Sequence, residues 1–250
     1  MNKKTVLFKS AAVLFALCVW QIAALAVGKE MLLASPVQVI RRLGELIFEA
    51  GFAKTALFSF LRISAGFLLA FAAGIVLAAA AGRFNWISYL LWPFMVTVKS
   101  VPVASFIILC LIWLTYGQLT VFISFLIAFP VIYTNVLQGI RSTDPKLKEV
   151  AQLYRIPWRR RLLYMYVPGV KPYLLSACGI GVGMAWKAGV AAEVIGIVNG
   201  SIGEKLYNAK IYFQNADLLA WTVVIVLLSV ISEKVFALLL RTVFGRLERL

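Results

Sequence analysis

The chain of 250 residues has no histidine, three cysteines and ten acidic residues. Without histidine it can form no Ser-His-Asp triad, no histidine metal site and no imidazole proton shuttle. Cys18, Cys110 and Cys178 lie far apart inside apolar runs, a spacing that gives neither a CxxC metal site nor a disulfide framework. We therefore expect unreactive, buried thiols, no catalytic residue and no metal site.

Charge is also scarce. Charged residues make up 14% of the chain, hydrophobic residues make up 62%, and the mean hydropathy is +0.92. A soluble domain has about a quarter charged residues and about half apolar ones. The composition therefore predicts an all-α integral membrane protein in contact with the lipid bilayer. The net charge of +15 is better explained by membrane topology than by a nucleic acid partner, which we do not expect.

Apolar runs of about 20 residues are long enough to cross the hydrocarbon core as helices. The chain has six, the third interrupted by Pro93, Lys99 and Pro102. We interpret the first as a retained signal anchor, because the sequence after it stays membranous. Residues 1–250 thus form a single transmembrane domain, with spans at about 8–27, 62–82, 86–114, 119–137, 172–198 and 217–240.

The distribution of basic residues predicts the direction of these spans. With the N-terminus inside, six spans place sixteen of the 25 Lys and Arg residues on the cytoplasmic side. Among them are Arg249 and the run Arg159-Arg160-Arg161, whereas the outer side receives basic residues mixed with acids such as Glu30. This bias has the sign of the positive-inside rule, so both termini are expected in the cytoplasm. On the outer side, Ser35-Pro36 predicts the start of a short amphipathic helix over residues 37–50.

The longest polar segment, residues 141–171, lies between spans four and five. Asp144 followed by Pro145 predicts a helix start with Asp144 as N-cap. We expect a first short helix over residues 146–154, a break at Ile156-Pro157, and a second helix over 158–166 that ends at Pro168-Gly169. Such a hairpin could offer a rigid knob to another protein; the alternative is an ordinary basic topological loop.

The hairpin carries a spaced pattern: Glu149-Val150-Ala151, then Arg155, then Met165, Val167 and Pro168. It resembles a motif in the permease subunit of binding-protein-dependent ABC importers, which reads Glu-Ala-Ala, three residues, Gly, nine residues, Ile, one residue, Leu-Pro. Arg155 stands where that family has glycine, a departure that bears on the tight turn between the two helices. Four further segments are similar to the nitrate/sulfonate/taurine/bicarbonate branch: residues 32–36, 99–102, 186–193 and 200–203.

This resemblance implies a type I ABC importer-like fold in the bacterial cytoplasmic (inner) membrane, with six transmembrane helices and a cytoplasmic coupling-helix hairpin between helices 4 and 5. It further implies a second permease copy, ABC ATPase subunits and an extracytoplasmic solute-binding protein as partners. The chain has no GxxxxGK[ST] loop, so ATP and Mg would be bound by the partner ATPase. By the same resemblance, the hairpin docks on that ATPase through the residues Asp144, Glu149, Ala151, Arg155 and Pro168.

Three charges inside the predicted spans are candidates for the translocation path: Lys99, Lys187 and Glu193. Ionisable residues in a membrane are expensive and often functional. At the helical rise, Lys99 and Lys187 would lie about 20 Å and about 22 Å into their spans, a level at which four ammonium groups of a dimer would suit an anion. The alternative for each lysine is snorkelling or pairing with a backbone carbonyl. Glu193 would lie near the outer mouth.

The branch and its lysines together favour a small anion of the nitrate, sulfonate/taurine or bicarbonate type as substrate. The same machinery importing a vitamin or a heterocyclic precursor remains an alternative. A channel or secondary transporter that works without an ATPase is a further alternative, although the sequence shows no convincing internal repeat.

Overall fold

The computed structural model describes residues 3–29 and 31–247. Glu30 and Arg249, which the topology prediction uses, lie outside this range. All regular structure in the described part is helical. The helices, in chain order, are α1 (Lys3–Val27), α2 (Pro36–Ile47), α3 (Phe52–Arg83), α4 (Asn85–Ser100), α5 (Val103–Cys110), α6 (Tyr116–Arg141), α7 (Pro145–Leu153), α8 (Trp158–Arg161), the π-helix η1 (Leu162–Tyr166), α9 (Val167–Gly196), α10 (Ile202–Ile211) and α11 (Asn215–Leu247).

Among the described residues, five helical segments are long and apolar enough to cross a membrane: α1, α3, α6, α8 to α9, and α11. A sixth span exists if α4 and α5 count together, although their axes differ by 104°. The bend falls at Val101-Pro102, because Pro102 lacks the N–H that would continue the helix, whereas Pro93 lies inside α4 without ending it. Helix α3 begins at Phe52, ten residues before the predicted span.

The centre of the molecule is a close-packed trio of α3, α6 and α9. Gly66 and Gly74 allow the approach: a Cβ at Gly66 would lie 2.4 Å from the carbonyl oxygen of Val121, and one at Gly74 would lie 2.8 Å from Ile132 Cγ2. A Cβ at Gly189 would likewise lie 2.5 Å from Ser124 Oγ. Small residues permit such contacts between membrane helices.

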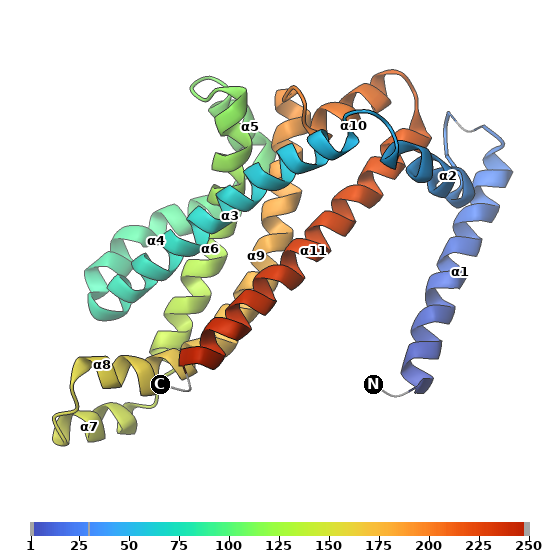
Figure 1. Ribbon diagram of the computed structural model, residues 1–250. Helices are drawn as coiled ribbons and strands as arrows, with labels where there is room; N and C mark the ends of the chain where they lie inside the picture. Colours follow the sequence, from blue (N-terminus) through green and yellow to red (C-terminus); the bar gives the residue numbers. More distant parts are fainter. Residues whose placement is uncertain (1–2, 30, 248–250) are drawn as a thin grey trace.

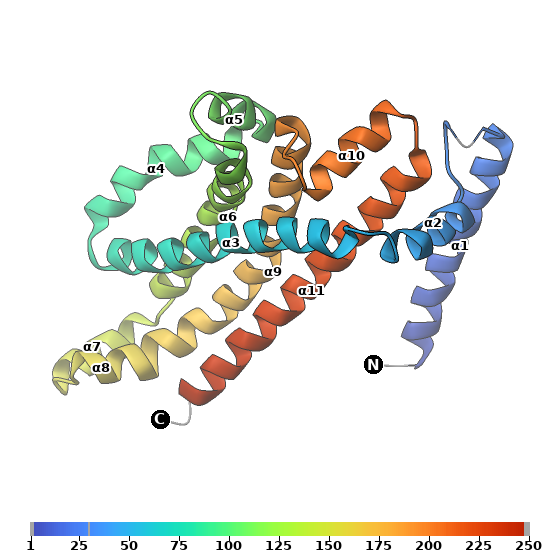
Figure 2. The same ribbon diagram turned by 45° about the horizontal axis from the view of Figure 1, so that its top comes forward.

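Helices α1 and α11 lie outside this centre and are far less buried than its helices. In the most apolar part of each helix, 6% of the residues of α1 and 11% of those of α11 are buried, compared with 67% for α6. Figures 1 and 2 show α1 standing apart from the other spans, joined to them through α2. Cys18 on α1 is consequently exposed, so the prediction of buried thiols is wrong for this residue and confirmed for Cys110 and Cys178.

The two ends of the bundle differ in their contents. In Figure 1, α5 and α10 lie at the upper end, whereas α7, α8, the start of α1 and the end of α11 lie at the lower end. The amphipathic helix was predicted over residues 37–50 and is observed as α2, with Ser35 as N-cap in a capping box with Gln38. Helix α10 was not predicted.

Candidate functional site

The hairpin between α6 and α9 begins as its sequence predicts. The Asp144 carboxylate accepts a hydrogen bond from the backbone N–H of Lys146 (2.9 Å), and Pro145 occupies the first turn of α7. Glu149 is exposed on α7, together with the side chains of Leu147 and Val150. The exposed surface of α7 thus presents a carboxylate and apolar side chains, a composition that suits contact with another protein.

Ala151 lies on the opposite, inner surface of α7 and is 1% exposed. Its carbonyl oxygen accepts hydrogen bonds from Arg161 Nη2 (2.7 Å) and from the backbone N–H of Ile156 (3.0 Å). A charge-assisted bond from α8 to α7 holds the two short helices together. The hairpin is therefore closed by contacts within the chain, and its exposed surface stays available.

The turn after α7 forms although arginine replaces the motif glycine. Arg155 adopts the left-handed conformation with φ of 49°. The N–H of Ile156 bonds to the carbonyl of Ala151, and the N–H of Arg155 bonds to that of Gln152, which is the Schellman pattern at a helix C-terminus. A non-glycine residue in this conformation costs about 1–2 kcal/mol. The departure from the motif thus leaves the turn geometry intact at an energetic cost.

Pro168 does not end the second hairpin helix, so that expectation is wrong. Helix α8 passes through η1 into α9 without a break, and Pro168 lies in the first turn of α9. Within η1 the backbone widens, and the N–H of Val167 bonds to the carbonyl of Leu162, five residues earlier. In an α-helix, proline clashes with the carbonyl four residues earlier, and that position relative to Pro168 lies within η1. The hairpin is therefore continuous with a membrane span.

The two candidate path lysines project from exposed positions next to buried residues. Lys187 is exposed between Trp186 and Ala188, which are 2% and 4% exposed. Lys99 is exposed in the last turn of α4, next to buried Val98 and just before the bend. Neither lysine is used in the packing of its own chain.

A further charge, Glu233 on α11, was not among the predicted path residues. Its side chain is exposed, and a Cβ at Gly179 of α9 would lie 3.3 Å from its Oε1. Glu233 falls within the predicted sixth span, so the rule that singled out the lysines could also have found it.

Glu193, the third path candidate, is fully enclosed by its own chain, with 0% of the residue exposed. Its Oε2 accepts hydrogen bonds from Ser59 Oγ of α3 (2.8 Å) and from the backbone N–H of Gly203 of α10 (3.2 Å). Ser59 Oγ in turn accepts a bond from the N–H of Ile202 (2.9 Å). One carboxylate therefore joins three helices, and in this structure a solute could not contact it.

The carboxylate of Glu193 lies at the N-terminal turn of α10, where the helix dipole favours negative charge. The approach requires glycine at position 203, since a Cβ there would lie 2.2 Å from Glu193 Cβ. Ser201 caps α10 by accepting a bond from the N–H of Glu204 (3.1 Å). The sequence Ser-x-x-Glu is a helix-start signal that could have predicted α10, but Ser59 lies 134 residues from Glu193 and leaves no local signal.

A second polar cluster on the same end joins α2 to α11. The Arg42 guanidinium donates to the Asp217 carboxylate and lies 2.7 Å from Glu49 Oε1. The hydrogen bond to Asp217 raises the pKa of Arg42 above its ordinary value, so this guanidinium stays charged at every pH of interest. Among the described residues, no group of three or more His, Cys, Asp or Glu side chains could hold a metal ion.

The chain is similar in sequence to a family of transport proteins over most of its length. Residues 70–249 match the family described as binding-protein-dependent transport system inner membrane component. Three similar proteins are each 26% identical to this chain. The protein named as an aliphatic sulfonates transport permease, SsuC, of Bacillus subtilis aligns with 90% of this chain and 82% of its own length. The taurine transport system permease protein TauC of Escherichia coli aligns with 86% of this chain and 80% of its own length, and the nitrate import permease protein NrtB of Synechococcus elongatus with 77% and 72%.

Proposed function

The chain belongs to the family of inner membrane components of binding-protein-dependent transport systems, and from this premise we propose that it is the permease subunit of an ABC importer for a small anion. The observation that carries the proposal is the hairpin α7–α8, which projects from the bundle (Figure 1) and continues directly into α9. The chain itself would be non-catalytic, and a partner ATPase would bind ATP and Mg.

We propose six spans, with α4 and α5 forming one broken span, and a cytoplasmic location for the lower end in Figure 1. Support comes from the start of α1, the end of α11 and the hairpin, all of which lie at that end. The run Arg159-Arg160-Arg161 lies in α8 at the same end. This arrangement agrees with the positive-inside rule and places α2 and α10 outside, toward a solute-binding protein.

Coupling would proceed through the exposed surface of α7. In this proposal Glu149 forms a charge-assisted contact with the ATPase, while Asp144, Ala151 and Arg155 maintain the shape of the hairpin. Because α8, η1 and α9 form one helical rod, a movement of the ATPase would displace α9 together with the hairpin. Pro168 lies at the junction and would keep the rod in register through the π segment.

The translocation path would be lined by Lys99 and Lys187 of both copies in a homodimer. Support comes from their exposure and from their neighbours Val98 and Ala188, which belong to one buried cluster. The similar proteins are named for nitrate, sulfonates and taurine, and ammonium groups suit such oxyanions. Glu193 would act at the outer mouth through its contact with α10.

Co-purification tests the coupling proposal. We expect an ATPase to co-purify from the native membrane with the wild-type chain and to be lost with Glu149→Arg. The matched control is Glu45→Arg, which reverses an exposed carboxylate on α2 at the other end. Retention of the ATPase by Glu149→Arg would contradict the hairpin's role. A chain that purifies alone and moves solute in liposomes would be a channel or secondary transporter.

Uptake assays test the path. With the co-purified binding protein identified, we expect Lys99→Gln and Lys187→Gln each to reduce uptake of its anion several-fold at normal expression. Lys234→Gln, which changes an exposed lysine on α11, should leave uptake unchanged. Unchanged uptake in either path variant would remove that lysine from the proposal and favour snorkelling.

A further inference from the structure

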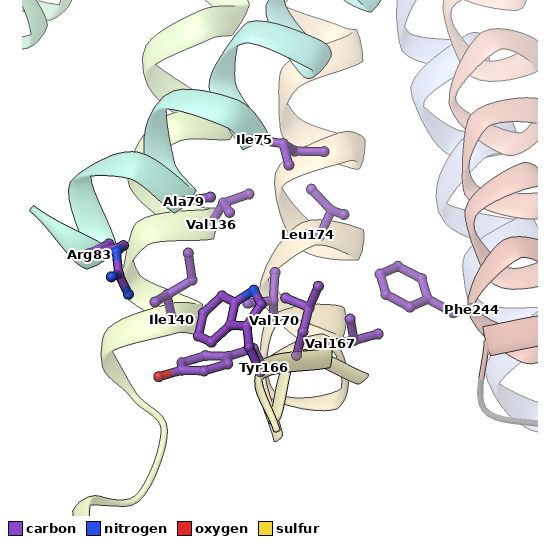
Figure 3. Close-up of a pocket in the computed structure, with 13 residues that line it drawn as sticks. Ile75, Ala79, Arg83, Val136, Ile140, Tyr166, Val167, Val170, Leu174 and Phe244 are labelled. Atoms are coloured by element: carbon purple, nitrogen blue, oxygen red, sulfur yellow. The ribbon is translucent and has the colours of Figure 1, made fainter. Parts of the chain in front are cut away.

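An apolar cavity of about 470 Å³ lies between α3, α6, α9 and α11, at the end that carries the hairpin. This volume is within the range of small-molecule sites, about 300–1,000 Å³. Figure 3 shows aliphatic side chains of α3, α6 and α9 on its walls and Phe244 of α11 on the far side. Among the described residues that line it, none is acidic.

The cavity lies at the level where the spans end. Arg83 is the last residue of α3, Ile140 is next to the last residue of α6, and Val167 is the first residue of α9. Trp158 and Tyr166 line the same opening, with ring centroids 5.7 Å apart. Tryptophan and tyrosine prefer the boundary between hydrocarbon and headgroups, so the cavity opens at a membrane surface.

Arg83 gives this opening a positive charge. Its side chain is exposed at the end of α3, and in Figure 3 it lies at the edge of the cavity beside Ile140. Exposed Arg159 and Arg160 follow Trp158 on α8 and add to the basic character of this surface. An apolar cavity with a basic rim is complementary to a molecule with an acyl chain and an anionic headgroup.

We propose that this cavity binds one anionic phospholipid, with an acyl chain among Ile75, Val136 and Leu174 and the phosphate at Arg83. Basic pockets between membrane helices on the cytoplasmic side are suited to such headgroups. The assignment to the cytoplasmic leaflet rests on the proposed topology, whereas the cavity and its charge do not. Because Trp158 and Tyr166 belong to α8 and η1, the bound lipid would brace the hairpin against the bundle.

Native mass spectrometry of the full-length chain, titrated with dioleoyl phosphatidylglycerol or dioleoyl phosphatidylcholine, tests this site. The two lipids have identical chains, so any preference reports the headgroup. We expect wild type to bind one phosphatidylglycerol with clear preference, and Arg83→Gln to weaken that binding about fivefold, the effect of one basic residue near the surface. Arg246→Gln, an exposed arginine at the same end of α11, is the matched control.

A second pair of variants tests the cavity itself. Ala79→Trp introduces a large side chain on the cavity wall and should abolish binding, whereas Val76→Trp, on the exposed face of α3, should not. If Ala79→Trp fails to fold, Arg83→Gln alone decides, since its side chain is exposed. Three outcomes would each overturn the proposal. The two lipids could bind wild type equally, or Arg83→Gln could keep the wild-type preference. Wild type could also bind no lipid, because a second copy covers the cavity. The test involves no transport, so it can fail or succeed independently of the proposed function.

Discussion

The two ends of the molecule are held in different ways. At the end that carries α10, buried Glu193 joins α3, α9 and α10 through hydrogen bonds that water cannot reach. At the end that carries the hairpin, α7 and α8 project from the bundle, and their charged and apolar side chains are exposed. The α10 end is held together by contacts within one chain, whereas the hairpin end has a surface available for a partner. Substitutions should therefore affect stability at the α10 end and assembly at the hairpin end.

The largest effect should come from the close contact between α9 and α10. Gly203→Ala would place a Cβ 2.2 Å from Glu193 Cβ, so α10 must move away from α9. We expect a loss of about 3 kcal/mol or more in the free energy of unfolding, toward the upper range of overpacked sites. Thermal unfolding in detergent would measure it. The control is Gly183→Ala on α9, where no atom lies within 4 Å of the added methyl; equal effects of the two substitutions would contradict this account.

The next effect should come from the buried carboxylate. Glu193→Ala removes the acceptor of Ser59 Oγ and of the Gly203 N–H, leaving buried donors unpaired. We expect Glu193→Ala to lower the free energy of unfolding by about 2–3 kcal/mol. The loss should be smaller for Ser59→Ala, because that change leaves one buried donor, the Ile202 N–H, without its acceptor. Coupled groups show non-additive effects, so additive losses in the variant that combines Glu193→Ala with Ser59→Ala would contradict a shared hydrogen-bond network.

A smaller effect is expected from the more exposed cluster on the same end. The side chains of Arg42 and Asp217 are 27% and 19% exposed, so solvent weakens their attraction. Arg42→Ala should cost about 1 kcal/mol, and the cost should fall at high salt. A double-mutant cycle with Asp217→Ala would isolate the pair. A cost that does not change with ionic strength would point to packing of the arginine stem instead.

The smallest effects should distinguish two similar turns. Arg155 and Ile197 are both left-handed, with φ of 49° and 48°. Glycine relieves this conformation, so each substitution by glycine should raise stability by up to about 1 kcal/mol. The gain should be larger for Ile197, because a β-branched side chain tolerates positive φ least. Destabilisation by Arg155→Gly would show that the arginine makes contacts that outweigh the strain.

Local signals in the sequence predicted several elements correctly. Apolar runs predicted the long apolar helices α1, α3, α6, α9 and α11, and Asp144-Pro145 and Ser35-Pro36 predicted helix starts that are present. The effect of a proline was not predictable in this way: the backbone bends between α4 and α5 at Pro102, whereas Pro93 and Pro168 lie inside continuous helices. Each proline removes one helical hydrogen bond, and whether the helix continues depends on its packing against residues that are distant in sequence.

The candidate site was predictable only in part, for a similar reason. Lys99, Lys187 and Glu193 share the signal of a charge within an apolar run, yet the structure encloses Glu193 and exposes both lysines. That difference arises from Ser59 and α10, which are distant in sequence. Periodicity describes one helix at a time and cannot show which face meets a partner far along the chain.

The continuity of α8, η1 and α9 gives the chain the mechanics of a lever. Helix α9 approaches α6 closely at Gly189, where a Cβ would lie 2.5 Å from Ser124 Oγ, and this contact can serve as a fulcrum. At 1.5 Å per residue, the arm from Gly189 to Trp158 is about 46 Å long and the arm to Glu193 is about 6 Å. A large displacement of the hairpin would thus produce a smaller displacement, with a larger force, at α10. Spin labels at positions 158 and 205, each paired with a reference label on α6, would show whether the two displacements differ in this proportion.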